Sequence, residues 1–471
     1  MKLKIDYKWI ALSVTGIGAF MSTLDGSIVV IGLPTILQKL NATIVEGVWI
    51  ITGYKLMMTM FLILFGRLAD MYGRVKLYNM GFVIFTVGSL FCALSQNGGQ
   101  LVAFRFLQGA GAALLMANSI AIIADAFPKK ELGLGLGSIM MAANVGAIAG
   151  YTLSGVLITY FGWRSIFLMN VPIGIFGTIW GYLQLKEIGI KTGGHKFDYA
   201  GSILYCIGLA IVLLALTIGD PLSVRNLSVL AIGLVVFVAV IFVELRQKYP
   251  IIDLALFRIR LFATGNIANF LNCLAFACGP FLRSLYLQLV LGYSPLKTGV
   301  LLIPMDALIF VLNPISGRLA DKYGSKILCV LGLAFDASAL IWFSTLNAKS
   351  SYSTVLISLL LFGIGIAMFA PAITSSIMGS VPAEKRGISS GIQNTVTQTA
   401  GVLSIPFSLL LMTLVMPYNQ LSHIVNGSQL INPVEVPIFL KAINMACLIL
   451  GIITLMAIIP ILTGDRKAKT I

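Results

Sequence analysis

The chain has 471 residues, of which 58% are hydrophobic and only 10% are charged. An ordinary soluble domain carries about 25% charged residues, so this composition excludes a globular cytosolic enzyme. The net charge of +15 is spread over short loops between apolar runs, which indicates topology determinants rather than a nucleic-acid-binding surface.

Apolar runs separated by polar breaks predict fourteen transmembrane helices. A helix needs about 20 residues to cross the hydrocarbon core of a bilayer, and the runs are of that length. In chain order, the predicted helices cover residues 9–34, 47–67, 77–95, 99–124, 134–159, 164–184, 198–218, 226–245, 262–290, 296–318, 326–346, 353–377, 388–416 and 437–462.

Lys and Arg residues are distributed unevenly between the two sets of loops. The two tails and the loops on their side hold 23 of the 32, and the opposite loops hold only Lys39, Arg164, Arg225, Lys297 and Lys349. Positive charge accumulates on the cytoplasmic side of membrane proteins. We therefore predict a multi-pass protein of the plasma membrane with both termini in the cytoplasm, which requires an even number of spans.

An octapeptide is repeated in the two halves of the chain. Gly66-Arg67-Leu68-Ala69-Asp70-Met71-Tyr72-Gly73 recurs as Gly317-Arg318-Leu319-Ala320-Asp321-Lys322-Tyr323-Gly324, identical at seven of eight positions. Each copy ends an apolar run and opens a basic loop. The spacing predicts a six-helix repeat in residues 1–184, an inserted helix pair with its linkers in 185–261, and a second six-helix repeat with the tail in 262–471. Parallel repeats of this kind build major facilitator transporters.

Four motifs carry a resemblance to a known family. The first is the octapeptide with Arg74 and Lys76, and the others are Leu24-Asp25-Gly26-Ser27-Ile28-Val29-Val30-Ile31-Gly32-Leu33-Pro34, Arg105-Phe106-Leu107-Gln108-Gly109-Ala110-Gly111 and Trp163-Arg164-Ser165-Ile166-Phe167-Leu168-Met169-Asn170-Val171-Pro172-Ile173-Gly174. Together they resemble the fourteen-helix drug:proton antiporter branch of the major facilitator superfamily.

The resemblance implies an all-α integral membrane fold and a secondary active transporter. It would export drugs or amphiphilic small molecules in exchange for protons, as a monomer in the lipid bilayer, by alternating access. The energy source would be the proton gradient, with no cofactor. The alternatives are a major facilitator carrier for metabolite uptake or uniport, and a membrane receptor that no longer transports. Neither metal-ligand spacing nor a nucleotide-binding loop nor a soluble catalytic domain is present, so we predict no enzyme activity and no metal.

Ionisable residues inside membrane spans are costly and usually functional. Six stand out, and they are the candidate proton-coupling and central-cavity residues: Asp25, Lys55, Arg105, Arg283, Asp306 and Asp336. The predicted helix ends place Asp25 roughly 13 Å and Lys55 roughly 12 Å from the outer surface, with Arg105 in the same layer. Asp25 would be a titrating carboxylate paired with one of these bases. The alternatives are a static ion pair and, for Lys55, a side chain that snorkels to the interface.

The repeated octapeptides are candidate gates on the cytoplasmic side. Their residues of interest are Gly66, Asp70, Gly73 and Arg74 in the first copy, and Gly317, Asp321 and Gly324 in the second. The glycines would allow tight turns, and Asp70 would pair with Arg74 or accept hydrogen bonds from a helix N-terminus. The second copy has Ser325 in place of Arg74, which predicts a weaker latch. The alternative is a loop that only sets topology.

The fifth predicted helix carries Gly146, Gly150 and Gly155, which resemble the glycine-rich antiporter signature. Tyr151 stands where the signature has proline and Ser154 where it has glycine, so a kink there cannot come from proline. The alternative is a close-packed helix interface without a mechanistic role. The three acids and three bases inside the spans sum to zero, so neutral, zwitterionic and anionic amphiphiles are all open as substrates.

Overall fold

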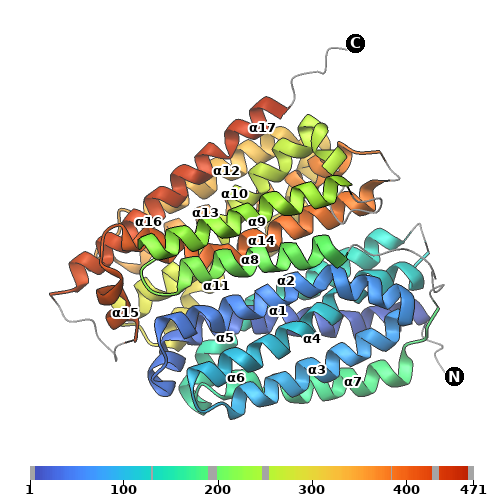
Figure 1. Ribbon diagram of the computed structural model, residues 1–471, viewed down its shortest axis with the longest axis horizontal. Helices are drawn as coiled ribbons and strands as arrows, with labels where there is room; N and C mark the ends of the chain where they lie inside the picture. The colour runs from blue at the N-terminus through green and yellow to red at the C-terminus, as the bar shows by residue number, and fades with distance from the viewer. Residues whose placement is uncertain are drawn as a thin grey trace. The chain divides into compact units, whose positions relative to one another are not determined.

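The computed structural model describes residues 6–128, 131–188, 199–246, 254–382, 385–426 and 434–464. Within these ranges the chain forms helices and no strands (Figure 1). By length and composition, 13 of the described helical segments can cross a membrane, and a shorter apolar helical segment covers Ile203–Thr217. The chain is therefore an all-helical, multi-pass membrane protein.

Two compact units make up the chain. The first unit comprises Met1–Phe197 with Ser294–Val300, and the second comprises Asp198–Tyr293 with Leu301–Ile471. The helices of the first unit are α1 (Tyr7–Leu40), α2 (Ile44–Tyr72), α3 (Arg74–Leu94), α4 (Gly98–Ala126), α5 (Leu132–Phe161), α6 (Ser165–Leu168) and α7 (Asn170–Gln184). The short α6 and α7 together make one membrane span, Ser165–Gln184.

The second unit begins with a helical hairpin and continues with the second set of membrane helices. Its helices are α8 (Tyr199–Thr217), α9 (Val224–Arg246), the 3₁₀ helix η1 (Leu254–Arg258), α10 (Arg260–Leu285), the π-helix η2 (Tyr286–Val290), α11 (Pro295–Tyr323), α12 (Ser325–Phe343), α13 (Tyr352–Gly379), α14 (Arg386–Thr413), α15 (Tyr418–Asn426), α16 (Val436–Met456) and α17 (Ile458–Gly464). The first residues of α11, as far as Val300, belong to the first unit.

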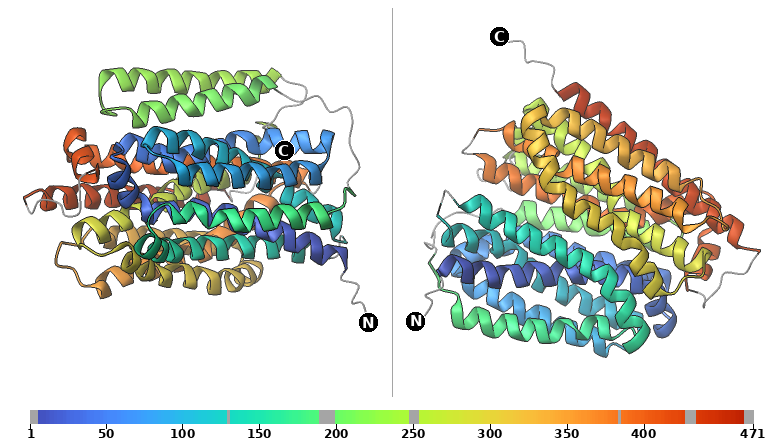
Figure 2. Two further views of the ribbon diagram at one scale, coloured as in Figure 1. Left: turned by 90° about the horizontal axis from the view of Figure 1, so that it is seen from below. Right: turned by 180° about the vertical axis from the view of Figure 1, so that it is seen from behind.

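The hairpin α8–α9 packs as two antiparallel neighbours, seen side by side in Figure 2. It joins the rest of its unit through α14, where the hydroxyl groups of Tyr205 and Thr399 form a hydrogen bond. The outer faces of α9 are apolar and exposed, with Val235 and Phe242 more than half accessible. A bilayer solvates such a surface, which explains why so few of its residues are buried.

Most predicted helix ends lie within a few residues of the observed ones, and the first helix is the main exception. Its predicted end at Pro34 is wrong, because α1 continues through this proline to Leu40. Membrane helices tolerate an internal proline when neighbouring helices satisfy the freed backbone groups. Gly73 and Gly324 end α2 and α11 with φ angles of 113° and 87°, which other residues rarely adopt.

Candidate functional site: buried charges in the two units

A buried polar network lies between α1, α4 and α7 in the first unit. Asp25 of α1 forms an ion pair with Arg105 of α4, and both side chains are fully buried. The Nε2 of Gln108 and the Nδ2 of Asn170 each donate to Oδ1 of Asp25, at 2.8 Å. Arg105 and Gln108 stand three residues apart on α4, which places them on one face of the helix.

The guanidinium of Arg105 is held on every side. Its Nε donates to the carbonyl oxygen of Ile50 at 2.9 Å, and its Nη1 donates to Oε1 of Gln108 at 2.6 Å. The ring centroids of Tyr54 and Phe167 lie 4.2 Å and 5.8 Å from its Cζ atom. A buried charge is tolerated when it is paired and hydrogen-bonded in this way.

The structure brings together Asp25 and Arg105, and it places both Asp25 and Lys55 further from their helix ends than the apolar runs indicated. Because α1 ends at Leu40, Asp25 lies roughly 22 Å along the helix from that end. Lys55 lies roughly 16 Å from the start of α2 at Ile44, and its side chain is half-buried. Both distances exceed those to the predicted helix ends, because α1 and α2 extend further than the apolar runs indicated.

Gln108 and Asn170 were not among the predicted site residues, although they lie in the motifs Arg105–Gly111 and Trp163–Gly174. Each is a fully buried amide that donates to Asp25. The spacing of Gln108, one turn after Arg105, was the available signal. Asn170 offered only its polarity within an apolar run, and nothing local shows which helix such a residue faces.

The three charged candidates of the second unit lie on three different helices. Arg283 of α10, Asp306 of α11 and Asp336 of α12 are all buried, with 1%, 8% and 1% of their surfaces exposed. Arg283 is within electrostatic range of both acids. Among the described residues, however, it forms neither an ion pair nor a hydrogen bond. Arg283 is therefore buried without the direct hydrogen-bond partners that Arg105 has in the first unit.

Two acids, Asp125 and Glu187, hold the turn between α2 and α3. Nη1 of Arg74 contacts both carboxylate oxygens of Asp125, at 2.7 Å and 2.8 Å. The carboxylate of Glu187 accepts hydrogen bonds from the backbone N–H groups of Arg74 and Val75, at 2.8 Å and 3.1 Å. An acid at a helix N-terminus satisfies free N–H groups and complements the helix dipole. The side chain of Asp70 lies outside those that the structure describes.

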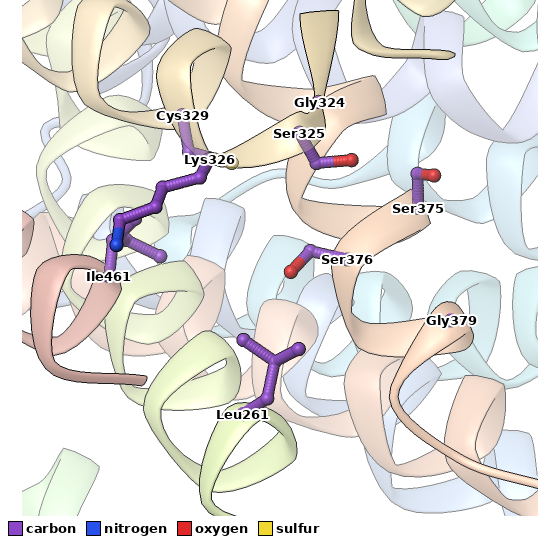
Figure 3. Close-up of a pocket in the computed structure, with 9 residues that line it drawn as sticks. All are labelled: Leu261, Gly324, Ser325, Lys326, Cys329, Ser375, Ser376, Gly379 and Ile461. Atoms are coloured by element: carbon purple, nitrogen blue, oxygen red, sulfur yellow. The ribbon is translucent and has the colours of Figure 1, made fainter. Parts of the chain in front are cut away.

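The second copy of the octapeptide borders a pocket of about 330 Å³ (Figure 3). Gly324, Ser325 and Lys326 line it from the turn between α11 and α12, and Ser376 and Leu261 line it from α13 and α10. A Cβ atom at Gly324 would meet no atom within 4 Å, whereas one at Gly73 would lie 2.8 Å from Oε2 of Glu187. The two turns thus share their backbone but not their surroundings. The side chain of Asp321 is outside the described set.

Gly66 and Gly317 both lie inside helices, a few residues before these turns. A Cβ atom at Gly66 would meet only the Cβ of Ala117, at 4.0 Å, and one at Gly317 would meet nothing within 4 Å. Neither position requires glycine for packing, so the turn itself depends on the second glycine of each octapeptide.

We expect Arg74→Ala and Asp125→Ala to be coupled in a double-mutant cycle. The pair is about three-quarters buried at each side chain, so the coupling energy should be about 1 kcal/mol in thermal unfolding of the purified protein. Lys76→Ala removes an exposed charge from the same helical turn and serves as the control. Additive losses from Arg74 and Asp125 would show that the ion pair does not contribute to stability.

The glycines of α5 form a close contact with α1. A Cβ atom at Gly150 would collide with Oγ of Ser27 and would lie 2.7 Å from the carbonyl oxygen of Leu24. A Cβ atom at Gly146 would likewise collide with the carbonyl oxygen of Phe20. Gly155 packs on the backbone of Leu296, in the short segment that belongs to the first unit.

Hydroxyl groups strengthen the same contact between α1 and α5. Thr23 and Ser27 of α1 donate to the carbonyl oxygens of Ala143 and Ala147, at 2.7 Å and 3.0 Å. In return, Ser154 of α5 donates to the carbonyl oxygen of Ile28 at 2.6 Å. Small residues and hydroxyl side chains that bridge neighbouring helices are typical of membrane interfaces. Ser154 thus has a packing role at the position where the signature has glycine.

Comparisons with known proteins identify the family to which the sequence is similar. Residues 15–405 match the family model of the Major Facilitator Superfamily. The riboflavin transporter RibZ of Clostridioides difficile is 32% identical over 413 residues, which cover 88% of this chain and 90% of RibZ. The tetracenomycin C resistance and export protein of Streptomyces glaucescens is 30% identical over 401 residues, covering 84% of this chain and 74% of that protein. The multidrug resistance protein Stp of Mycobacterium tuberculosis is 33% identical, covering 83% and 74%.

Solved structures share the fold at low sequence identity. A bacterial homologue of the human lysosomal transporter Spinster superposes with a TM-score of 0.72 at 15% identity, covering 99% of this chain and 98% of the other. A D-xylose–proton symporter superposes with a TM-score of 0.66 at 15% identity, covering 99% and 100%. Family, relatives and fold all identify a membrane transporter, so the expectation that the chain is not an enzyme is confirmed.

Proposed function

This chain belongs to the Major Facilitator Superfamily, and on that basis we propose that it is a proton-coupled exporter of amphiphilic small molecules. The observation that supports this most directly is the ion pair of Asp25 with Arg105, buried among hydrogen-bond donors in the first unit. Ionisable groups buried inside membrane spans are the usual carriers of coupled protons.

The network suggests how a proton would act. Deprotonated Asp25 accepts from Arg105, Gln108 and Asn170, so the carboxylate links α1 to α4 and α7. Protonation removes its charge and weakens the charge-assisted bonds. Arg105 retains the carbonyl oxygen of Ile50 and the amide of Gln108, so the positive charge stays in place. Proton uptake would thus loosen α1 from its neighbours and favour the other state of an alternating-access cycle.

Relatives support export as the direction. The protein from S. glaucescens is named for resistance and export, and Stp is named for multidrug resistance. We propose the same direction here, with 14 membrane helices, of which α8 would be one, and with both termini in the cytoplasm. A monomer in the lipid bilayer suffices for the mechanism, because the ion pair and its donors all come from one chain.

Metabolite uptake is the second candidate, and one observation favours it. The alignment covers 90% of the relative RibZ, which is named a riboflavin transporter and not a drug-resistance protein. A uniporter or a symporter on this fold would keep the same helices, and the difference would lie in the direction in which the proton moves relative to the substrate.

Proteoliposomes that contain a luminal pH indicator distinguish the candidates. We would add riboflavin, rhodamine 6G or fluorescein outside the vesicles and follow the luminal pH. An antiporter exchanges entering substrate for leaving protons, so the lumen becomes more alkaline. A symporter acidifies the lumen, and a uniporter moves substrate without a pH change. Luminal acidification, or substrate entry without proton movement, would contradict the proposed exchange.

A further inference from the structure

The guanidinium of Arg283 is the most unusual buried group outside the Asp25 network. It lies on α10 in the second unit, with 1% of its surface exposed. Among the described residues, its Nε, Nη1 and Nη2 atoms have no hydrogen-bond partner. A buried charge without partners is costly, and native proteins rarely retain one unless a function requires it.

Aromatic rings surround this guanidinium. Its Cζ atom lies 4.1 Å from the ring centroid of Phe362 and 5.6 Å from that of Phe343. Phe362 in turn stacks on Phe276, with the centroids 5.3 Å apart and an angle of 11° between the planes. The rings attract the cation, but they offer no acceptors to its N–H groups. Arg283 therefore has N–H donors without partners beside the stacked Phe276–Phe362 ring pair, which we call the phenyl wall.

The neighbouring acids do not supply the missing acceptors. Within the described part of the chain Arg283 donates to neither Asp306 nor Asp336, and the carboxyl group of Asp336 interacts with the side chain of Asn272 instead. Arg105 in the first unit shows the opposite arrangement, because there an acid and an amide hold the guanidinium directly. Both units bury an arginine near acids, and only the second leaves its arginine available.

The backbone of α10 is irregular on both sides of Arg283. Pro280 lies three residues before it and has no N–H group, so one bond of the helix is lost. The π-helix Tyr286–Val290 begins three residues after it. Gly279 provides the necessary space, since a Cβ atom there would lie 2.6 Å from Nη1 of Arg283. π-helical turns occur frequently at functional sites, and both features allow a helix to bend.

We propose that Arg283 and the Phe276–Phe362 ring pair form a subsite for an aromatic substrate that carries an anionic group. The guanidinium donates to that group through two N–H bonds, and the substrate ring packs on the phenyl wall. The inference rests on the proposed transport function and specifies the substrate class for it. Arg283 is buried in this conformation, so the substrate reaches it when the surrounding helices move apart, as alternating access requires.

A pair of fluorescent probes tests the subsite. Fluorescein and rhodamine 6G share a three-ring xanthene core and carry opposite charges. We would titrate each against the purified full-length protein in detergent and follow fluorescence anisotropy. The wild type should bind fluorescein more tightly than rhodamine 6G. Arg283→Gln should weaken fluorescein binding by about tenfold or more and leave rhodamine 6G unchanged or tighter, because a charge-assisted hydrogen bond is lost.

Three further variants complete the experiment. Arg225→Gln removes an exposed charge from the same unit and should bind both probes as the wild type does. Arg283→Lys keeps the charge and should retain part of the affinity for fluorescein. Phe362→Leu should weaken both probes, because both xanthene rings would pack on the wall.

Several results would overturn the inference. These are a wild type that does not prefer fluorescein, equal weakening of both probes in Arg283→Gln, or restored binding when Arg283→Gln is combined with Asp336→Asn. The last would identify Asp336 as the partner of Arg283 in another conformation. Binding in detergent needs no proton gradient, so these results are independent of the luminal pH assay. Selective binding without proton exchange would instead reject the proposed antiport and keep the subsite.

Discussion

Asp25→Asn should abolish substrate-linked proton movement while the protein still folds and inserts. Asparagine cannot take up a proton in the relevant range, but it matches the size of aspartate and still presents an oxygen to Gln108 and Asn170. We expect at least about a 100-fold loss of proton flux in the luminal pH assay, since the loss of a specifically required proton carrier commonly has effects of this size. Substrate exchange without a proton gradient should be affected much less.

The same substitution should lower the apparent melting temperature. Arg105 would lose its ion pair but would keep the carbonyl oxygen of Ile50 and the side chain of Gln108. Breaking a buried pair from one side costs about 3–5 kcal/mol, and these remaining acceptors should place the loss at or below the lower end of that range. Thermal unfolding of the purified variant measures this directly.

Two further variants, Asp6→Asn and Asp25→Glu, make the experiment specific. Asp6→Asn carries the same chemical change at an exposed position just before α1, and it should retain full proton flux. Asp25→Glu retains a titratable group and should recover part of the activity. If Asp25→Asn moved protons at the wild-type rate, Asp25 would not be the coupling residue.

Gly150→Ala should destabilise the first unit strongly for so small a change. The new methyl group would press on Ser27 and on the backbone of Leu24 and Ile28 in α1. A flexible side chain can relieve a clash by changing its rotamer, but backbone atoms cannot. The helices α1 and α5 would therefore have to separate. Overpacking of this kind costs about 1–3 kcal/mol, and the hydrogen bonds between the helices would weaken as well. Combining it with Gly146→Ala should prevent accumulation of folded protein.

Gly137→Ala is the matched control on the same helix. A Cβ atom at Gly137 would meet nothing within 4 Å, so the substitution should be neutral or should stabilise by up to about 1 kcal/mol through helix propensity. Thermal unfolding and size-exclusion yield of the three variants provide the comparison. A Gly150→Ala protein as stable as Gly137→Ala would show that the close contact between α1 and α5 is not required.

Much of the architecture was predictable because its signals are local. Apolar run length determines where helices can span a bilayer, and the observed bounds follow the predicted runs closely. The turns between α2 and α3 and between α11 and α12 were predictable at Gly73 and Gly324, since a glycine at the end of an apolar run favours a positive φ angle. The end of α1 was not, because proline breaks helices in water but is tolerated inside a membrane protein.

The candidate site was only half visible in the sequence. An ionisable side chain inside a membrane span costs free energy and is therefore rare there. Asp25, Arg105 and Arg283 could for that reason be selected from their positions inside apolar runs. Their partners could not be selected in the same way. Asp125 and Glu187, which hold Arg74, lie near helix ends, where acidic residues are common and carry no particular signal.

By itself the sequence determined that this protein is a helical membrane carrier with a repeated turn motif and charges inside its spans. Hydrophobicity and repeated motifs are properties of the sequence, and they do not depend on how the helices pack. Only the tertiary structure decided that Arg105 is paired and Arg283 is not. That difference depends on how each helix is rotated and on which residues from other helices, such as Asp25 at 80 positions from Arg105, pack against it. No local pattern encodes this difference between a hydrogen-bonded ion pair and a buried guanidinium without a partner among the described residues.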